Sequence, residues 1–88
     1  MQVVELVEMI ESAIPHAKVR AVDLQGGGDH FEVSVVSEQF EGRSLIERHR
    51  IIYTAVGEAM QREIHALTIR VMSRHEEQAL ARRAAARE

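Results

Sequence analysis

The chain contains no cysteine and no tryptophan, and aromatic residues make up only 3% of its 88 residues. Without cysteine it can form no disulfide framework, no thiol nucleophile and no metal site with cysteine ligands of its own. Any soft metal centre in which it takes part would have to draw its sulfur ligands from a partner. With 88 residues the chain is long enough for one small domain, whose core must be economical.

Long apolar runs and an excess of positive charge are also missing. No apolar run approaches the roughly 20 residues that a membrane-spanning helix requires, and the N-terminal stretch MQVVELVEMIES is acidic and amphipathic. We therefore expect no signal peptide, no membrane partner and a cytoplasmic protein. A net charge of −3 argues against general affinity for nucleic acid or anionic membranes.

The best-marked helix lies between Phe40 and Met60, in the stretch FEGRSLIERHRIIYTAVGEAM. Ser44 and Glu47 have the spacing of a capping box, in which each side chain binds a backbone N–H of the other. Large or apolar residues then recur at the spacing of one helix face, at Leu45, His49, Ile52, Val56 and Met60, with Ile46 and Tyr53 widening the stripe. We predict that this stripe is buried and that His49 is a partly buried histidine without a catalytic role.

The remaining periodic segments predict one further helix and three strands. Apolar spacing over residues 2–14 predicts a first helix, which Pro15 ends. Alternation of apolar and polar residues predicts strands over 18–25 and 31–37, joined as an antiparallel hairpin. A third alternating segment, 66–72, follows the central helix, and a right-handed crossover makes it parallel to the second strand. The order α-β-β-α-β predicts an α+β fold with the helices on one face of a three-stranded mixed sheet.

The hairpin loop, residues 25–30, contains three successive glycines. No GK[ST] or GxGxxG pattern follows, so the loop is not predicted to bind phosphate. It is either a flexible hairpin tip or a mobile arm that presents Asp29 and His30.

The C-terminal segment begins with a second capping-box pattern, Ser73-x-x-Glu76, and is rich in alanine and in charges of both signs. We expect a solvated helical tail over residues 74–88, following a domain of residues 1–73. Its exposed face is expected to carry the arginines of the tail, Arg82, Arg83 and Arg87.

Residues with catalytic chemistry do not form a convergent set. There is no HExxH, no GxSxG and no Ser/His/Asp arrangement, so we expect no enzyme. The candidate metal ligands are the histidines, at positions 16, 30, 49, 65 and 75. His65 lies where the central helix leads into the last strand, and His30 lies at the end of the hairpin loop. Such positions can lie close together, but the sequence alone leaves open whether they do.

Three sequence features together resemble the BolA-like family. The block FEGxxLxxRHRxxY runs from Phe40 to Tyr53, a glycine-rich loop precedes Phe31, and the segment IHAL follows at residues 64–67. The resemblance covers residues from about 3 to 72. It implies a fold similar to class II KH domains, in agreement with the predicted order of elements.

The resemblance also implies a function. Members of the family bind monothiol glutaredoxins of the CGFS type and share a [2Fe-2S] cluster at the interface, where a glutaredoxin cysteine and glutathione are the partner's ligands. The family's C-terminal histidine matches His65, and its ligand in the variable hairpin loop matches His30. The expected protein is an adaptor in iron–sulfur trafficking or iron regulation, with no cluster bound by the isolated chain, which would be a monomer or a weak homodimer.

Two other functions remain open from the sequence. Some family members are described as transcription regulators, and a DNA-binding surface here would use the arginines Arg43, Arg48 and Arg50, with Arg20 nearby. The chain lacks the GXXG clamp of KH domains, and its tail departs from the TPEEW-like segment that the family often carries. The third possibility is an interaction or scaffolding domain in which the histidines are incidental.

Overall fold

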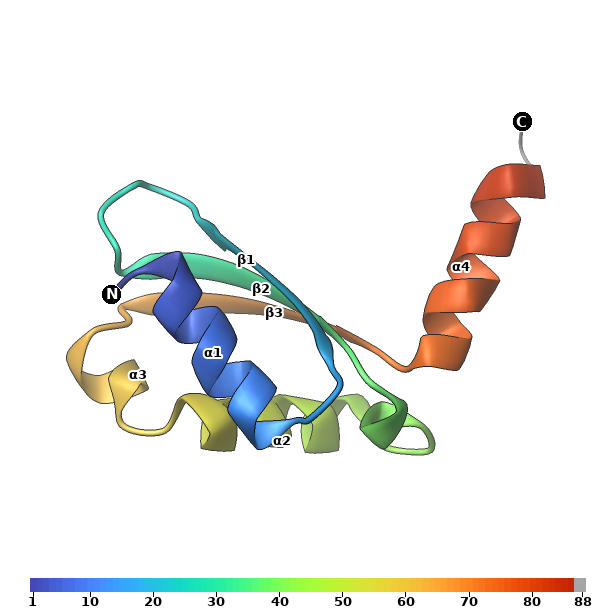
Figure 1. Ribbon diagram of the computed structural model, residues 1–88, viewed down its shortest axis with the longest axis horizontal. Coiled ribbons are helices and arrows are strands. Elements are labelled where there is room, and N and C mark those ends of the chain that lie inside the picture. Colours follow the sequence, from blue (N-terminus) through green and yellow to red (C-terminus); the bar gives the residue numbers. More distant parts are fainter. Residues whose placement is uncertain (87–88) are drawn as a thin grey trace.

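Three strands form a mixed sheet in the predicted order. In the computed structural model, which describes residues 1–86, β1 (Lys18–Asp23) pairs antiparallel with β2 (His30–Val36), and β2 pairs parallel with β3 (Ala66–Met72). The helices α1 (Val3–Ala13) and α2 (Leu45–Val56) cover one face of this sheet, α1 over β1 and α2 over β3 (Figure 1). The predicted strand pairing and the predicted layers are confirmed.

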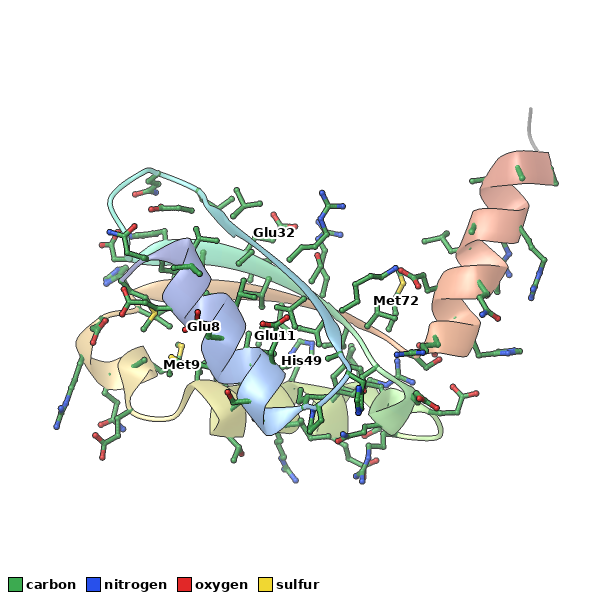
Figure 2. The ribbon with its side chains drawn as sticks, viewed as in Figure 1. Glu8, Met9, Glu11, Glu32, His49 and Met72 are labelled. Atoms are coloured by element: carbon green, nitrogen blue, oxygen red, sulfur yellow. The ribbon has the colours of Figure 1, made fainter. Side chains whose placement is uncertain are left out.

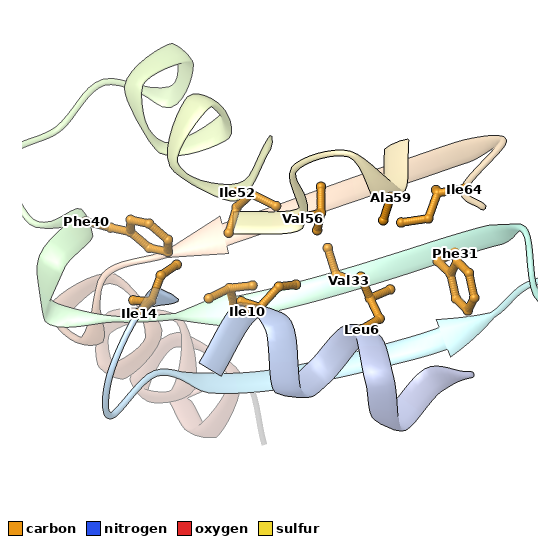
Figure 3. Close-up of a cluster of buried hydrophobic side chains, with 11 residues drawn as sticks. Leu6, Ile10, Ile14, Phe31, Val33, Phe40, Ile52, Val56, Ala59 and Ile64 are labelled. Carbon is orange, nitrogen blue, oxygen red and sulfur yellow. The ribbon is translucent and has the colours of Figure 1, made fainter. Parts of the chain in front are cut away.

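The core lies between the central strand β2 and the two helices. The inward side chains of β2, Phe31, Val33 and Val35, are at most 1% exposed. Around them pack hydrophobic residues of both helices and of the connecting segments (Figure 3), namely Leu6, Ile10, Ile14, Phe40, Ile52, Val56, Ala59 and Ile64. Phe40 enters this cluster from a short 3-10 helix, η1 (Glu38–Phe40), that follows β2. Among the described residues, no helix is both long and apolar enough to cross a membrane.

The central helix begins as predicted but ends earlier. The Ser44 backbone N–H donates to Glu47 Oε1 at 2.9 Å, and the Glu47 N–H donates to Ser44 Oγ at 3.1 Å, which completes the capping box. Gly57 then adopts a φ of 53°, a conformation that ends a helix and that glycine adopts readily. A separate short helix, α3 (Ala59–Arg62), follows. The prediction of one continuous helix to residue 60 is therefore wrong.

The buried face of α2 also differs from the predicted stripe. The buried residues are Arg48, Ile52 and Val56, and His49, which is labelled in Figure 2, is half-buried as predicted. The first residue of the predicted stripe, Leu45, is 63% exposed. Ile46 and Tyr53 are exposed as well. Compared with the prediction, the helix is rotated so that a charged residue faces inward and part of the apolar stripe faces outward.

Arg48 is buried because the fold supplies partners for its guanidinium group. Its Nε donates to the Arg43 carbonyl at 3.0 Å, and Nη1 and Nη2 donate to the Glu76 carboxylate at 2.5 and 3.2 Å. Glu76 also accepts the Ser73 backbone N–H at 2.8 Å, in the capping box of the last helix. The ion pair therefore connects α2 to the start of the C-terminal helix.

The C-terminal helix α4 (Arg74–Ala86) extends away from the sheet and has no buried residue (Figure 1). Arg82 and Arg83 are exposed, as predicted, whereas Arg87 lies outside the described residues. The boundary of the domain at residue 73 stays a prediction.

Stability at acidic pH should depend on Glu76. The Arg48 guanidinium, followed by the Ser73 N–H, lowers the pKa of Glu76 from 4.5 to about 2. A lowered pKa means that the ionised carboxylate stabilises the fold above about pH 4.5, and that this contribution is lost as the pH falls from 4.5 towards 2. We expect Glu76→Gln to lower the urea midpoint at about pH 7 and to have little effect at about pH 2. Glu11→Gln, at an exposed site of α1, is the control; an equal loss for Glu76→Gln at both pH values would contradict the prediction.

Candidate metal centre

The start of β2 and the start of β3 lie side by side at one end of the sheet. Because the two strands are parallel, His30 at the start of β2 is in register with Ala66 at the start of β3. The Asp29 carbonyl accepts the N–H of His65 at 2.7 Å and that of Ala66 at 3.2 Å. These hydrogen bonds connect the hairpin loop to the segment that leads into β3.

This arrangement brings together the two histidines that the sequence singled out. The ring centroids of His30 and His65 are 4.9 Å apart, and their planes are inclined by 34°. The His30 side chain is 25% exposed, and His65 is exposed. Asp29 Oδ2 lies 3.7 Å from His30 Nε2. The juxtaposition that the sequence left open is therefore present, and the ring nitrogens can be reached from solvent.

The glycine-rich loop has a defined conformation, which Asp23 maintains. The Asp23 carboxylate accepts the N–H of Gly26 and the N–H of Gly28, each at 2.9 Å. Gly28 has a φ of 79°, and a Cβ added there would lie 2.9 Å from the Met1 carbonyl oxygen. The loop is therefore a hydrogen-bonded turn, and the two alternatives expected from the sequence, a flexible tip or a mobile arm, stay predictions.

Asp23 is a residue of this site that the sequence analysis missed, since it was assigned only to a strand. The available signal was an aspartate shortly before a run of glycines, because aspartate side chains commonly accept backbone N–H groups in turns. Here the turn determines how the loop returns to His30.

Removing the Asp23 carboxylate should loosen the loop. We expect Asp23→Ala to lower the free energy of unfolding by about 1 kcal/mol, since two backbone donors lose a charged acceptor and neither glycine is buried. Faster amide exchange at Gly26 and Gly28, measured by NMR, should accompany the loss. Asp29→Ala removes the same charge without removing these bonds; equal exchange rates in the two variants would contradict this role of Asp23.

The remaining histidines do not join the pair. His16 lies in the turn between α1 and β1, His75 lies in α4, and both are at the end of the sheet opposite the pair. His49 lies within α2. Within residues 1–86 no group of three or more His, Cys, Asp or Glu side chains is placed to hold a metal ion. His30 and His65 thus form a two-nitrogen donor set.

The three arginines proposed for DNA binding do not form one exposed patch. Arg48 is only 8% exposed, and its donors are engaged by Glu76 and by the Arg43 carbonyl. Arg43 is exposed and donates to the Gln39 carbonyl at 3.0 Å. Arg50 is exposed on another side of α2, beside the end of α1. Arg48 is therefore not part of a basic surface.

Comparison with known proteins agrees with this fold. A family model described as BolA-like protein matches residues 4–76. Protein BOLA2 of Arabidopsis thaliana is 48% identical over 62 residues, which cover 69% of this chain and 66% of that protein, just under two thirds of its length. The solved structure of a bolA protein homologue from Coxiella burnetii is 33% identical with a TM-score of 0.76, over 89% of this chain and 97% of that one. Yeast Fra2 is 38% identical with a TM-score of 0.72, over 88% and 84% of the two chains.

Proposed function

Because this chain belongs to the BolA-like family, we propose that it is a non-enzymatic adaptor that pairs with a monothiol glutaredoxin and shares a [2Fe-2S] cluster with it. In this proposal the chain supplies two imidazole ligands, from His30 and His65. The observation that carries the proposal is the placement of these two rings, whose centroids lie 4.9 Å apart at one end of the sheet.

The donor set fits one half of such a site. Two histidines can replace two cysteines on one iron of a [2Fe-2S] centre, and they raise its reduction potential. Metal–imidazole distances near 2 Å are compatible with two neighbouring rings that converge on one ion. Since the sequence contains no cysteine, the thiolate ligands must come from outside the chain. The glutaredoxin cysteine and glutathione implied by the resemblance meet this need.

Asp29 has a supporting role in the proposed site. Its carbonyl holds the backbone of His65, and its carboxylate lies 3.7 Å from His30 Nε2. A carboxylate beside a ligating histidine can orient the ring and raise its basicity through the nitrogen that does not bind metal. Asp29 is therefore assigned to positioning the two histidines and not to ligation.

The alternative of a DNA-binding regulator stays a prediction with less support. The chain has a net charge of −3, it lacks a GXXG clamp, and Arg48 is engaged within the fold. A cytoplasmic location likewise stays a prediction.

The proposal is tested by anaerobic mixing with a cluster-loaded monothiol glutaredoxin, followed by visible absorption and circular dichroism. We expect a new spectrum for the wild-type chain and its loss or change for His65→Ala and for His30→Ala. His75→Ala, at an exposed histidine of α4, is the matched control and should behave as wild type. Far-UV circular dichroism verifies that each variant is folded.

Two results would contradict the proposal. A complex whose spectrum is the same for wild type and both histidine variants would remove His30 and His65 from the cluster. Absence of any complex would remove the adaptor function, and DNA titration at several salt concentrations would then test the alternative.

A further inference from the structure

The outer edge of β3 exposes a regular row of backbone donors and acceptors. Within residues 1–86 the strand order is β1-β2-β3, so no strand pairs with the outer edge of β3, which is its free edge. The Ala66 N–H donates to the Asp29 carbonyl and the Met72 carbonyl accepts from Ser37, so these two residues direct their backbone groups towards β2. Successive residues of a strand alternate in this direction. The alternate residues between them therefore direct their backbone N–H and C=O groups to the free edge. These residues are Leu67, Ile69 and Val71.

The two edge strands of the sheet differ in their protection. Charged residues on an edge strand, lysine above all, oppose pairing with another chain, as does proline. The edge strand β1 carries Lys18, Arg20 and Asp23. The sequence of β3, ALTIRVM, contains neither lysine nor proline, and its one charged residue, Arg70, forms an ion pair with Glu32 at 2.6 Å. The free edge of β3 therefore lacks the usual barriers to pairing.

An exposed apolar flank of α2 adjoins this edge. Ile52 and Val56 point into the core (Figure 3), and Ile51 and Ala55 lie on the side of α2 that faces α1. Because α1 covers β1 and α2 covers β3, the opposite side of α2 lies along the free edge of β3. On that side Ile46 is 66% exposed and Tyr53 is 45% exposed, and the half-buried His49 lies on the same flank. An unprotected strand and an apolar helix flank thus lie on the same side of the domain and together make up one candidate surface.

We propose that this surface pairs with a second copy of the chain, β3 against β3 in antiparallel orientation, about a twofold axis at Ile69. The sequence of β3 is self-complementary in this register. Leu67 of one copy lies opposite Val71 of the other, and Ile69 lies opposite Ile69 of the other copy. These are the residues whose backbone groups are free. Thr68 lies opposite Arg70, so the only charge of the strand meets a neutral hydroxyl group and not its own copy. The apolar flanks of the two α2 helices then lie on the same face of the joined sheets, and twofold pairing is the commonest form of self-association.

The test is the oligomeric state by analytical ultracentrifugation from about 10 μM to about 1 mM, a range suited to a small, weak interface. Thr68→Lys places two like-charge pairs with Arg70 across the axis and should weaken the dimer about tenfold, whereas Thr68→Glu should strengthen it about tenfold. Val22→Lys adds the same charge to the same exposed sheet face on β1 and should leave the dimer unchanged.

Amide exchange measured by NMR identifies the interface directly. Leu67, Ile69 and Val71 should gain protection with rising concentration, while Thr68 and Arg70, which face β2, are protected throughout. A monomer over the whole range would overturn the proposal, and so would a dimer that is insensitive to both Thr68 variants. A monomer whose Leu67, Ile69 and Val71 amides become protected only when glutaredoxin is added would assign the edge to a foreign strand instead. The proposal is independent of the ligand role of the histidines.

Discussion

Replacing Phe31 by alanine is expected to lower the free energy of unfolding by about 4 kcal/mol. Phe31 is fully buried on the central strand and is one of the largest side chains in the core (Figure 3). Its removal loses the burial of an aromatic ring and leaves a cavity between α1, β2 and the segment before β3, which cannot close without moving the sheet. The free energy of unfolding of a whole domain of this size is about 5–15 kcal/mol, so the variant should be close to unfolding.

The measurement is urea denaturation followed by far-UV circular dichroism. Tyr53→Ala removes a ring of similar size that is 45% exposed on α2, and it should cost less than about 1 kcal/mol. Because Phe31 directly follows His30, the Phe31 variant should also weaken any ligand binding at the histidine pair. If Phe31→Ala lowered the free energy of unfolding no more than Tyr53→Ala does, the prediction that the buried Phe31 ring stabilises the core would be wrong.

Replacing Arg48 by alanine is expected to lower the free energy of unfolding by about 2–3 kcal/mol. The variant loses the hydrogen bond to the Arg43 carbonyl, both hydrogen bonds to Glu76 and the packing of the buried arginine stem. This expected loss in the free energy of unfolding is smaller than the largest losses for broken buried ion pairs. The reason is that the Glu76 side chain is 46% exposed and can be hydrated when its partner is lost.

Two comparisons isolate this interaction. Arg50→Ala, two positions along α2 and exposed, should change stability by less than about 0.5 kcal/mol. In a double-mutant cycle, the effects of Arg48→Ala and Glu76→Ala should not add, since the two side chains bind each other. Additive effects would show that the pair with Glu76 does not contribute, and that Arg48 acts through its packing and its hydrogen bond to the Arg43 carbonyl. Far-UV circular dichroism of Arg48→Ala should also report reduced helicity, because α4 has no buried residue to hold it otherwise.

The fold could be predicted from the sequence because its signals are local. Strand alternation, the turn before the second strand and both serine–glutamate capping boxes act over a few residues, and each appears in the structure where the sequence places it. The parallel pairing of β2 with β3 followed from the handedness of the crossover.

The rotation of α2 could not be predicted in this way. Hydrophobic periodicity locates an apolar stripe, but it does not distinguish a face that packs in the core from one that remains exposed. Leu45 and Ile46 are apolar and exposed, and Arg48 is charged and buried. The partner that makes the burial of Arg48 possible is Glu76, which is distant in the sequence, so no local pattern reveals it.

The candidate site was found in part by residue type and in part by resemblance. The absence of cysteine left histidine as the ligand type, and the family motif selected His65 and His30. Their proximity depends on strand register, which only the structure supplies. The start of the tail is also more similar to the TPEEW-like segment than its residue types suggest. Ser73-x-x-Glu76 keeps the spacing of threonine and the second glutamate in TPEEW, and Glu76 binds Arg48.

The parallel pairing of β2 and β3 has a consequence for how the site forms in time. The β1–β2 hairpin closes a short loop, but β3 can dock only after a long segment containing two helices has been closed, a step with a larger entropic cost and a slower rate. One imidazole ring lies on β2 and the other lies directly before β3, so the two rings meet only after this segment has closed. A chain in which β3 is undocked therefore contains both histidines but no site, and a ligand that bridges them binds only the folded state and stabilises it by mass action.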